Sequence, residues 1–203
     1  GALLSTGTSL YELDESRLLA ARPDLLIMQD LCDVCAITPT QVARVLHALE
    51  PAPRLVTLNP HRLNDVLRDI ETLGDAMERN EAGRQLTAAL RRRLEAVRTT
   101  VGMDSRNVRV ACLEWLSPLY SAGHWVPDMV EAARGTDALA AAGTPSRKVS
   151  WDALAASAPD VILLIPCGFT VARTKNEMAA VTGHPTWKSL PAVQRGEVYL
   201  VDA

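Results

Sequence analysis

Apolar residues along the chain fall into two alternating patterns, helical spacing and short continuous runs. Helical spacing marks one apolar face of a helix, whereas a continuous run of four to six apolar residues is typical of a buried strand. Their alternation predicts an α/β fold with parallel strands. The patterns predict helices after Asp14, over 42–49, 63–73, 82–101 and 129–133, and strands over 25–28, 55–58, 108–113, 161–165 and 198–201.

Three local details sharpen these predictions. The run 25–28 is too apolar to have a solvent-exposed face. Asn59 and Pro60 are of the types preferred at the N-cap and the first helical position, so a helix is expected to begin there. Gly74 is expected to interrupt that helix.

The helix predicted over 82–101 is longer than an ordinary crossover between strands needs. It spans about 30 Å, since each helical residue rises about 1.5 Å, and Gly102 ends it. We expect it to be a spine joining two halves. The predicted organisation is an N-terminal α/β lobe over 1–79, the spine over 80–102, and a C-terminal α/β lobe over 103–203.

The two halves also repeat one unit. Asp14 and Asp24 have the same spacing as Ser150 and Asp160, and each segment ends in Pro-Asp followed by an apolar strand. The repetition predicts two similar α/β lobes. Their strands would present their carboxyl ends to a shared cleft, which is where open α/β sheets bind ligands.

Composition excludes several classes of protein. The chain has 203 residues, of which 48% are hydrophobic, enough for one large domain or two lobes of about 100 residues. A net charge of −3 argues against nucleic acid as a partner. The glycine-rich motifs that bind nucleotide phosphates are also absent. No apolar run approaches the roughly 18 residues of a membrane helix. The sequence has no Ser-His-Asp spacing, paired catalytic carboxylates or H-E-x-x-H, so an enzyme is not expected.

Aromatic residues gather in one segment of a chain that is only 4% aromatic. Trp115, Tyr120 and Trp125 lie close together with His124, directly after the predicted strand 108–113. Such a loop at a strand end is suited to holding a flat or apolar ligand. The alternative is that the two tryptophans anchor a long loop onto the core. Beyond the strand 161–165, the single phenylalanine, Phe169, lies in a turn, and Arg173 is either an anion clamp or an ordinary surface arginine.

The four cysteines leave several interpretations open. Cys112 lies in a strand pattern and is most simply a small core residue. Cys32 and Cys35 form a C-x-x-C, which is either a redox pair, half of a zinc site completed by Cys167 and His124, or a local disulfide or packed pair of thiols.

Several motifs together resemble a known family. The chain resembles the helical-backbone (class III) substrate-binding proteins of ABC importers, in the branch that binds cobalamin and iron-siderophores. The resemblance rests on the two Pro-Asp units, the lone spine helix and the final segment, and within the class on these motifs: Gln29–Cys35, Glu114-Trp115, Gly123–Pro127 and Pro166–Phe169.

The resemblance implies two Rossmann-like, parallel-sheet α/β lobes joined by the spine helix. It also implies that the first lobe is incomplete and the chain truncated at both ends, because such proteins begin with a further strand–helix–strand portion and end with a helix. Their location is extracytoplasmic, either periplasmic or membrane-anchored. An ABC permease is the implied partner, and the membrane is reached only through it.

The implied function is capture of a corrinoid such as vitamin B12 (cobalamin) in the cleft, with no cofactor required. The residues expected to bind it are Glu114, Trp115, Tyr120, His124, Trp125, Phe169 and Arg173. One rival is a metal-binding or thiol-redox protein that uses Cys32, Cys35, Cys167 and His124, with zinc as the metal. The other rival is a siderophore or haem binder on the same scaffold.

Overall fold

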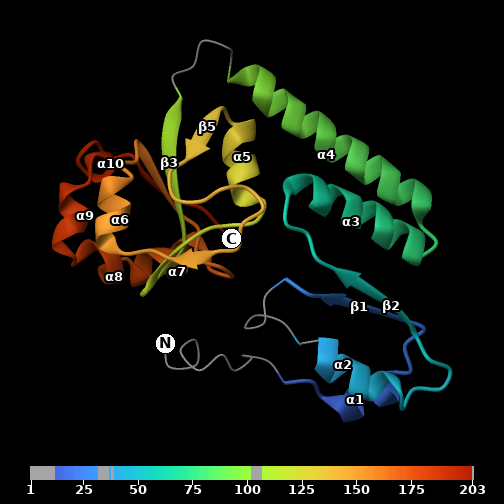
Figure 1. The fold of residues 1–203 in the computed structure, drawn as a ribbon. Coiled ribbons are helices and arrows are strands. Elements are labelled where there is room, and N and C mark those ends of the chain that lie inside the picture. Colours follow the sequence, from blue (N-terminus) through green and yellow to red (C-terminus); the bar gives the residue numbers. More distant parts are fainter. Residues whose placement is uncertain (1–11, 32–36, 38, 102–106, 203) are drawn as a thin grey trace. The chain divides into compact units, whose positions relative to one another are not determined.

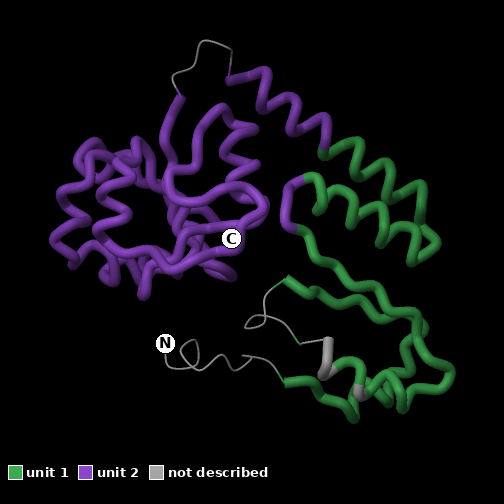
Figure 2. The backbone as a smooth tube through the Cα atoms, viewed as in Figure 1, with its two compact units in different colours: residues 1–60, 64–90 green, residues 61–63, 91–203 purple. Residues whose placement is uncertain are grey.

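The chain folds into two compact units. The computed structural model describes residues 12–31, 37, 39–101 and 107–202. One unit contains Gly1–Pro60 and Asn64–Leu90, and the other contains His61–Leu63 and Arg91–Ala203 (Figure 2). Three residues, His61–Leu63, therefore belong to the second unit although the chain on both sides of them belongs to the first. The predicted domain limits at residues 79 and 102 stay predictions.

The first unit combines helices with a small parallel sheet (Figure 1). The strands β1 and β2 pair in parallel from Leu25 with Arg54 to Gln29 with Leu58. The side chain of Asp14 accepts a hydrogen bond from the Arg17 backbone N–H at 3.0 Å and so caps the first helix, as its type predicts. The elements up to this point of the chain are α1 (Glu15–Ala21), β1 (Leu25–Gln29), α2 (Pro39–Leu46), β2 (Arg54–Leu58), α3 (Leu63–Ala76) and α4 (Asn80–Thr100). The first residue of α3 and the part of α4 after Leu90 belong to the second unit.

The prediction that the first strand has no solvent-exposed face is wrong. Ile27 is 44% exposed, and Leu55 on the neighbouring strand is 42% exposed. Among the described residues the two strands form a sheet by themselves, so each is an edge strand with a neighbour on one side only. The apolar run reflects the strand propensity of these residues rather than complete enclosure.

Gly74 does not interrupt its helix, which continues to Ala76. A Cβ atom at Gly74 would lie 3.1 Å from the Cα of Gly83 and 3.2 Å from the carbonyl oxygen of Arg79. The glycine therefore allows the backbones of α3 and α4 to approach closely within the first unit. At this position glycine permits close packing and does not break the helix.

The second unit is built on a mixed sheet. The strands follow the order β6-β4-β3-β7-β8, and β5 also pairs with β3. β3 pairs in parallel with β5 and β7, and β7 pairs in parallel with β8. β4 pairs antiparallel with both of its neighbours, β3 and β6. Its elements are β3 (Val108–Leu116), β4 (Leu119–Ser121), α5 (Val126–Ala132), β5 (Gly135–Asp137), β6 (Arg147–Lys148), α6 (Trp151–Ala156), β7 (Val161–Leu164), α7 (Val171–Glu177), α8 (Ala179–Thr182), α9 (Pro185–Ser189), α10 (Pro191–Gln194) and β8 (Val198–Leu200).

The core of this unit joins the central strands to the helices that follow them. Buried side chains from β3 and β7 pack with Leu154 of α6 and with Trp187 and Leu190 near the end of the chain. Ser150 caps α6 by accepting a hydrogen bond from the Ala153 backbone N–H at 3.1 Å. A capped helix that leads through Pro-Asp into a parallel strand thus occurs in both units, as the repeated sequence predicts.

The helices that the structure describes are each too short or too polar to span a bilayer.

We predict that Gly74→Ala lowers the free energy of unfolding by about 1 kcal/mol. Overpacking against the Gly83 backbone costs about 1–3 kcal/mol, and the better helix propensity of alanine offsets about 1 kcal/mol of this. Urea unfolding followed by far-UV circular dichroism measures the change. Asp75→Ala, at the exposed neighbouring position in the same helix, is the matched control and is expected to be near neutral. An increase in the free energy of unfolding for Gly74→Ala would contradict the close packing of Gly74 on the Gly83 backbone.

Candidate ligand-binding site

The first half of the aromatic segment 115–125 forms a β-hairpin. The sequence predicted a loop there. β3 runs on to Leu116 and turns into β4, and the register places Trp115 opposite Tyr120. Residues paired directly across two strands project from the same face of a sheet. Both side chains are half-buried, so two large aromatic residues are cross-strand partners and remain partly accessible.

The strand-end residues predicted from the sequence meet at the carboxyl ends of β3 and β7. These strands are parallel neighbours that end at Leu116 and Leu164, so the segments following them start at the same edge of the sheet. The Phe169 ring contacts the Trp115 ring edge-on, with centroids 5.4 Å apart. The backbone N–H of Cys167 donates a hydrogen bond to the carbonyl oxygen of Glu114 at 3.2 Å.

Phe169 is buried, and Arg173 stacks on its ring while the arginine side chain stays largely exposed. The Phe169 side chain is only 4% exposed, and the Arg173 guanidinium carbon lies 3.6 Å from its ring centroid. Arg173 also pairs with Glu177 at 3.2 Å, one helical turn later in α7. Stacking and ion pairing hold the arginine in place. The ligand contacts expected for these two residues stay predictions.

A tightly held loop carries His124 between β4 and α5. Gly123 lies so close to Thr144 and Ser146 that a Cβ atom there would overlap their backbones. His124 has a left-handed backbone, with φ of 53°. Its N–H donates to the carbonyl oxygen of Thr144 at 2.6 Å, and its own carbonyl accepts from the Gly143 N–H at 2.9 Å. The imidazole is therefore presented by a backbone held on both sides.

His61 is a site residue that sequence reasoning missed. Its ring centroid lies 5.8 Å from that of His124, which in turn lies 6.0 Å from Trp125. Burial lowers the pKa of His124, and the neighbouring His61 lowers it further, so the imidazole is neutral at pH 7. No local signal marks His61, because the contact joins distant parts of the chain. Only its position directly after Asn59-Pro60 sets it apart.

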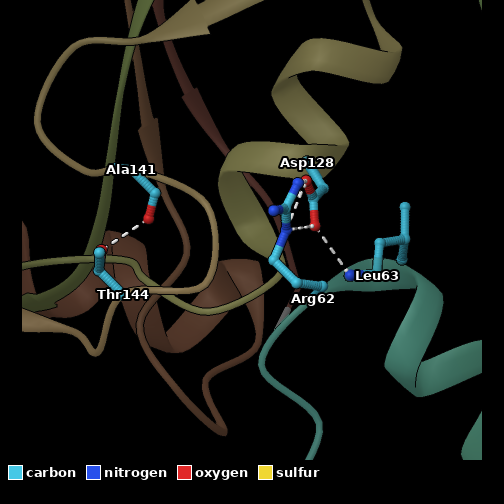
Figure 3. A network of polar contacts seen from close by, with 5 residues as sticks. All are labelled: Arg62, Leu63, Asp128, Ala141 and Thr144. Atoms are coloured by element: carbon cyan, nitrogen blue, oxygen red, sulfur yellow. Dashed lines mark hydrogen bonds and ion pairs between the residues drawn. The ribbon is translucent and has the colours of Figure 1, made fainter.

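Hydrogen bonds to Asp128 hold the two residues that follow His61 and so keep His61 next to His124. The Asp128 carboxylate accepts hydrogen bonds from Nε and Nη2 of Arg62, the shortest at 2.6 Å, and from the backbone N–H of Leu63 at 2.9 Å (Figure 3). Leu63 is the first residue of α3, whose N-terminal N–H groups have no partner within the helix. The helix therefore begins at Leu63 and not at Pro60, and the predicted cap at Asn59 is wrong, because a distant aspartate supplies an acceptor.

The remaining candidate residues differ in how their environment sets their charge. Burial raises the pKa of Glu114, and a hydrogen bond with Ser146 partly opposes this. Burial also raises the pKa of the Cys112 thiol to about 12, so it is an inert core residue, as its strand position predicts. Cys167 is an exposed free thiol.

The metal and redox interpretations depend on a pair that the structure does not describe. Cys32 and Cys35 lie outside the described residues. Within the ranges that are described, no three His, Cys, Asp or Glu side chains gather closely enough to hold a metal ion. The site predicted from Cys32, Cys35 and Cys167 stays a prediction.

Comparison with known proteins gives one family and one fold. Residues 11–203 match the family model described as periplasmic binding protein. A search of curated proteins gives no match to this chain. Among solved structures, the chain is similar to IsdE of S. aureus, complexed with heme, at 16% identity and a TM-score of 0.75, covering 94% of this chain and 72% of that one.

Two further structures carry other ligands in their names. The periplasmic vitamin B12 binding protein BtuF of Vibrio cholerae is 21% identical with a TM-score of 0.66, covering 93% of this chain and 69% of that one. A protein of an ABC-type Fe3+-hydroxamate transport system from Saccharomonospora viridis is 21% identical with a TM-score of 0.69. The match covers 95% of this chain and 66% of that one. These likenesses confirm the predicted α/β fold with parallel-rich sheets.

We predict that Asp128→Asn lowers the free energy of unfolding at pH 7 by roughly 1–2 kcal/mol. Hydrogen bonds to charged groups contribute about 1.5–3 kcal/mol, discounted here because the Arg62 side chain is 52% exposed. Hydrogen bonds from Arg62 and Leu63 lower the pKa of Asp128 despite its burial. A lowered pKa contributes stability above the unfolded value of 3.8 that is lost as the pH falls through the folded value.

The difference between wild type and Asp128→Asn should therefore shrink below pH 3.8, which thermal unfolding across a pH series measures. Asp152→Asn is the control, because Asp152 also lies in the first turn of a helix, α6, but is exposed. The hydrogen-bond network around Asp128 would be contradicted if both variants lost the same stability relative to the wild type. It would also be contradicted if the loss in Asp128→Asn did not depend on pH.

Proposed function

The chain belongs to the periplasmic binding protein family, and we propose that it captures a corrinoid for an ABC importer. Proteins of this family are carriers and not enzymes: they bind small ligands outside the cytoplasm and deliver them to a permease. The corrinoid is our choice among the ligand classes named for the similar structures, which are vitamin B12, haem and an iron hydroxamate.

The observation that carries the proposal is the pairing of Trp115 with Tyr120 across the hairpin. It gives the second unit two cross-strand, half-buried aromatic residues at the carboxyl end of β3. Burial of one aromatic face against a ligand contributes on the order of 1–3 kcal/mol. Trp125, half-buried beside His124, adds a third ring. Such a surface is suited to a large ligand with flat, apolar portions.

The charge of the site favours a corrinoid over the two rival ligands. Haem carries propionates and siderophores are often anionic, so both are favoured by unpaired arginines. Arg173 is held by Phe169 and Glu177, and Arg62 by Asp128. A corrinoid is rimmed by neutral amides, which His124 is suited to hydrogen-bond. The Glu114 carboxyl, whose pKa is raised by burial, also favours a neutral ligand.

The proposed location and partner follow from the family. We propose a periplasmic or membrane-anchored location, an ABC permease as the partner, and contact with the membrane only through that permease. No cofactor is required for capture. The expected closure of two lobes over a shared cleft stays a prediction.

The rival metal-binding or thiol-redox function rests on Cys32, Cys35 and Cys167. Its test is zinc that survives dialysis at one equivalent per chain, or a C-x-x-C that cycles with dithiol reagents.

We predict saturable binding of cyanocobalamin with a Kd in the micromolar range or tighter. Titration followed by tryptophan fluorescence and corrin absorbance measures it. Trp125→Ala and Tyr120→Ala should each weaken binding at least tenfold, or about 1.4 kcal/mol. Trp115 is less suited to substitution because it also packs on buried Phe169.

Tyr199→Ala is the matched control, because Tyr199 is an aromatic residue on β8 that is 50% exposed. It should bind cyanocobalamin like the wild type. Hemin and a ferric hydroxamate are titrated in parallel. Tighter binding of either one, or no cyanocobalamin binding by the folded protein, would refute the corrinoid assignment and leave the family unchanged.

A further inference from the structure

We propose that His61 and His124 form a binding site for a divalent transition-metal ion such as Ni²⁺, Cu²⁺ or Zn²⁺. The two imidazoles come from distant parts of the chain and lie together within the second unit. This pair is separate from the C-x-x-C. It shares His124 with the proposed corrinoid site, but metal binding by the pair does not require a corrinoid.

The spacing of the two rings suits a shared metal ion. A metal–nitrogen bond of about 2.0–2.1 Å plus the radius of the ring places an imidazole centroid about 3.2 Å from the metal. Two such rings around a tetrahedral ion have centroids about 5.2 Å apart, and a wider angle brings them further apart. The observed 5.8 Å lies within reach of this arrangement after a small rotation of either side chain.

His124 is held by its own backbone contacts, and His61 directly precedes two residues that are held by Asp128. His124 is fixed by hydrogen bonds with Thr144 and Gly143, and by the close approach of Gly123 to residues 144–146. His61 directly precedes Arg62 and Leu63, both of which donate hydrogen bonds to Asp128. A preorganised pair of ligands loses little conformational entropy on binding, which raises its affinity for a metal.

The surroundings fit a metal that prefers nitrogen ligands. Both side chains are half-buried, so solvent reaches the pair and water can complete the coordination. The nearest carboxylate in this network, Asp128, is already bonded to Arg62 and Leu63. Imidazole suits Ni²⁺, Cu²⁺ and Zn²⁺, whereas Mg²⁺ and Ca²⁺ require oxygen ligands.

The test is a calorimetric titration of tag-free, chelator-treated protein with Ni²⁺ alone. We expect one Ni²⁺ per chain with a Kd in the micromolar range. His61→Gln and His124→Asn should each weaken it at least tenfold, or about 1.4 kcal/mol. Asparagine is chosen at position 124 because it tolerates the left-handed backbone that His124 adopts. Circular dichroism and thermal unfolding verify that both variants fold.

Two controls separate this site from other ligands. His47→Gln removes an exposed histidine of the first unit and should leave Ni²⁺ binding unchanged. Cys167→Ser should also leave it unchanged. With Cu²⁺, electron paramagnetic resonance should show coupling to two imidazole nitrogens in the wild type and to one in each histidine variant.

Three results would overturn the proposal: no Ni²⁺ binding by the folded wild type at millimolar concentration, binding of undiminished affinity in either histidine variant, or binding lost only in Cys167→Ser. The titration contains no corrinoid, so a failure of corrinoid capture leaves its result unaffected.

Discussion

The carboxylate of Asp128 determines the course of the chain around the candidate site. It holds a distant segment by two kinds of donor, the guanidinium of Arg62 and the backbone N–H of Leu63. The Asp128 side chain is only 12% exposed, so this interaction contributes more than the 0–1 kcal/mol typical of surface ion pairs. Because Arg62 and Leu63 are held, residues 61–63 belong to the second unit, and His61 lies beside His124.

The positions of His124 and of the aromatic residues depend on close packing and pairing of the backbone. Gly123 allows the loop after β4 to lie against residues 144–146, and this contact fixes the backbone of His124. The β3–β4 hairpin fixes Trp115 and Tyr120 as cross-strand partners, and Phe169 packs under Trp115. Backbone pairing therefore positions these residues. For the proposed capture of a ligand, such preorganisation would reduce the entropic cost.

Much of the fold could be predicted from the sequence because its strands and long helices have strong local signals. The apolar runs gave β1, β2, β3, β7 and β8, and the helical spacing gave α4 within two residues. Contacts between distant residues carry no such signal. The start of α3 at Leu63 depends on Asp128, and the role of Gly74 depends on Gly83. β5 and β6 are too short to produce a recognisable pattern.

The same distinction applies to the site. The aromatic cluster was visible because three residues of scarce types lie close together in sequence, and the structure places two of them opposite each other. His61 was not visible, because its contact with His124 exists only through the tertiary fold. Nor could the sequence show that Phe169 would be buried against Trp115 and Arg173, since this burial depends on neighbours from two separate elements, β3 and α7.

The most direct test of the central claim is a crystal structure of the protein grown with cyanocobalamin. The account predicts a corrin ring against Tyr120 and Trp125, with its amide rim within hydrogen-bond distance of His124. A corrin bound elsewhere in the molecule, or crystals that contain only unliganded protein at saturating cyanocobalamin, would contradict it.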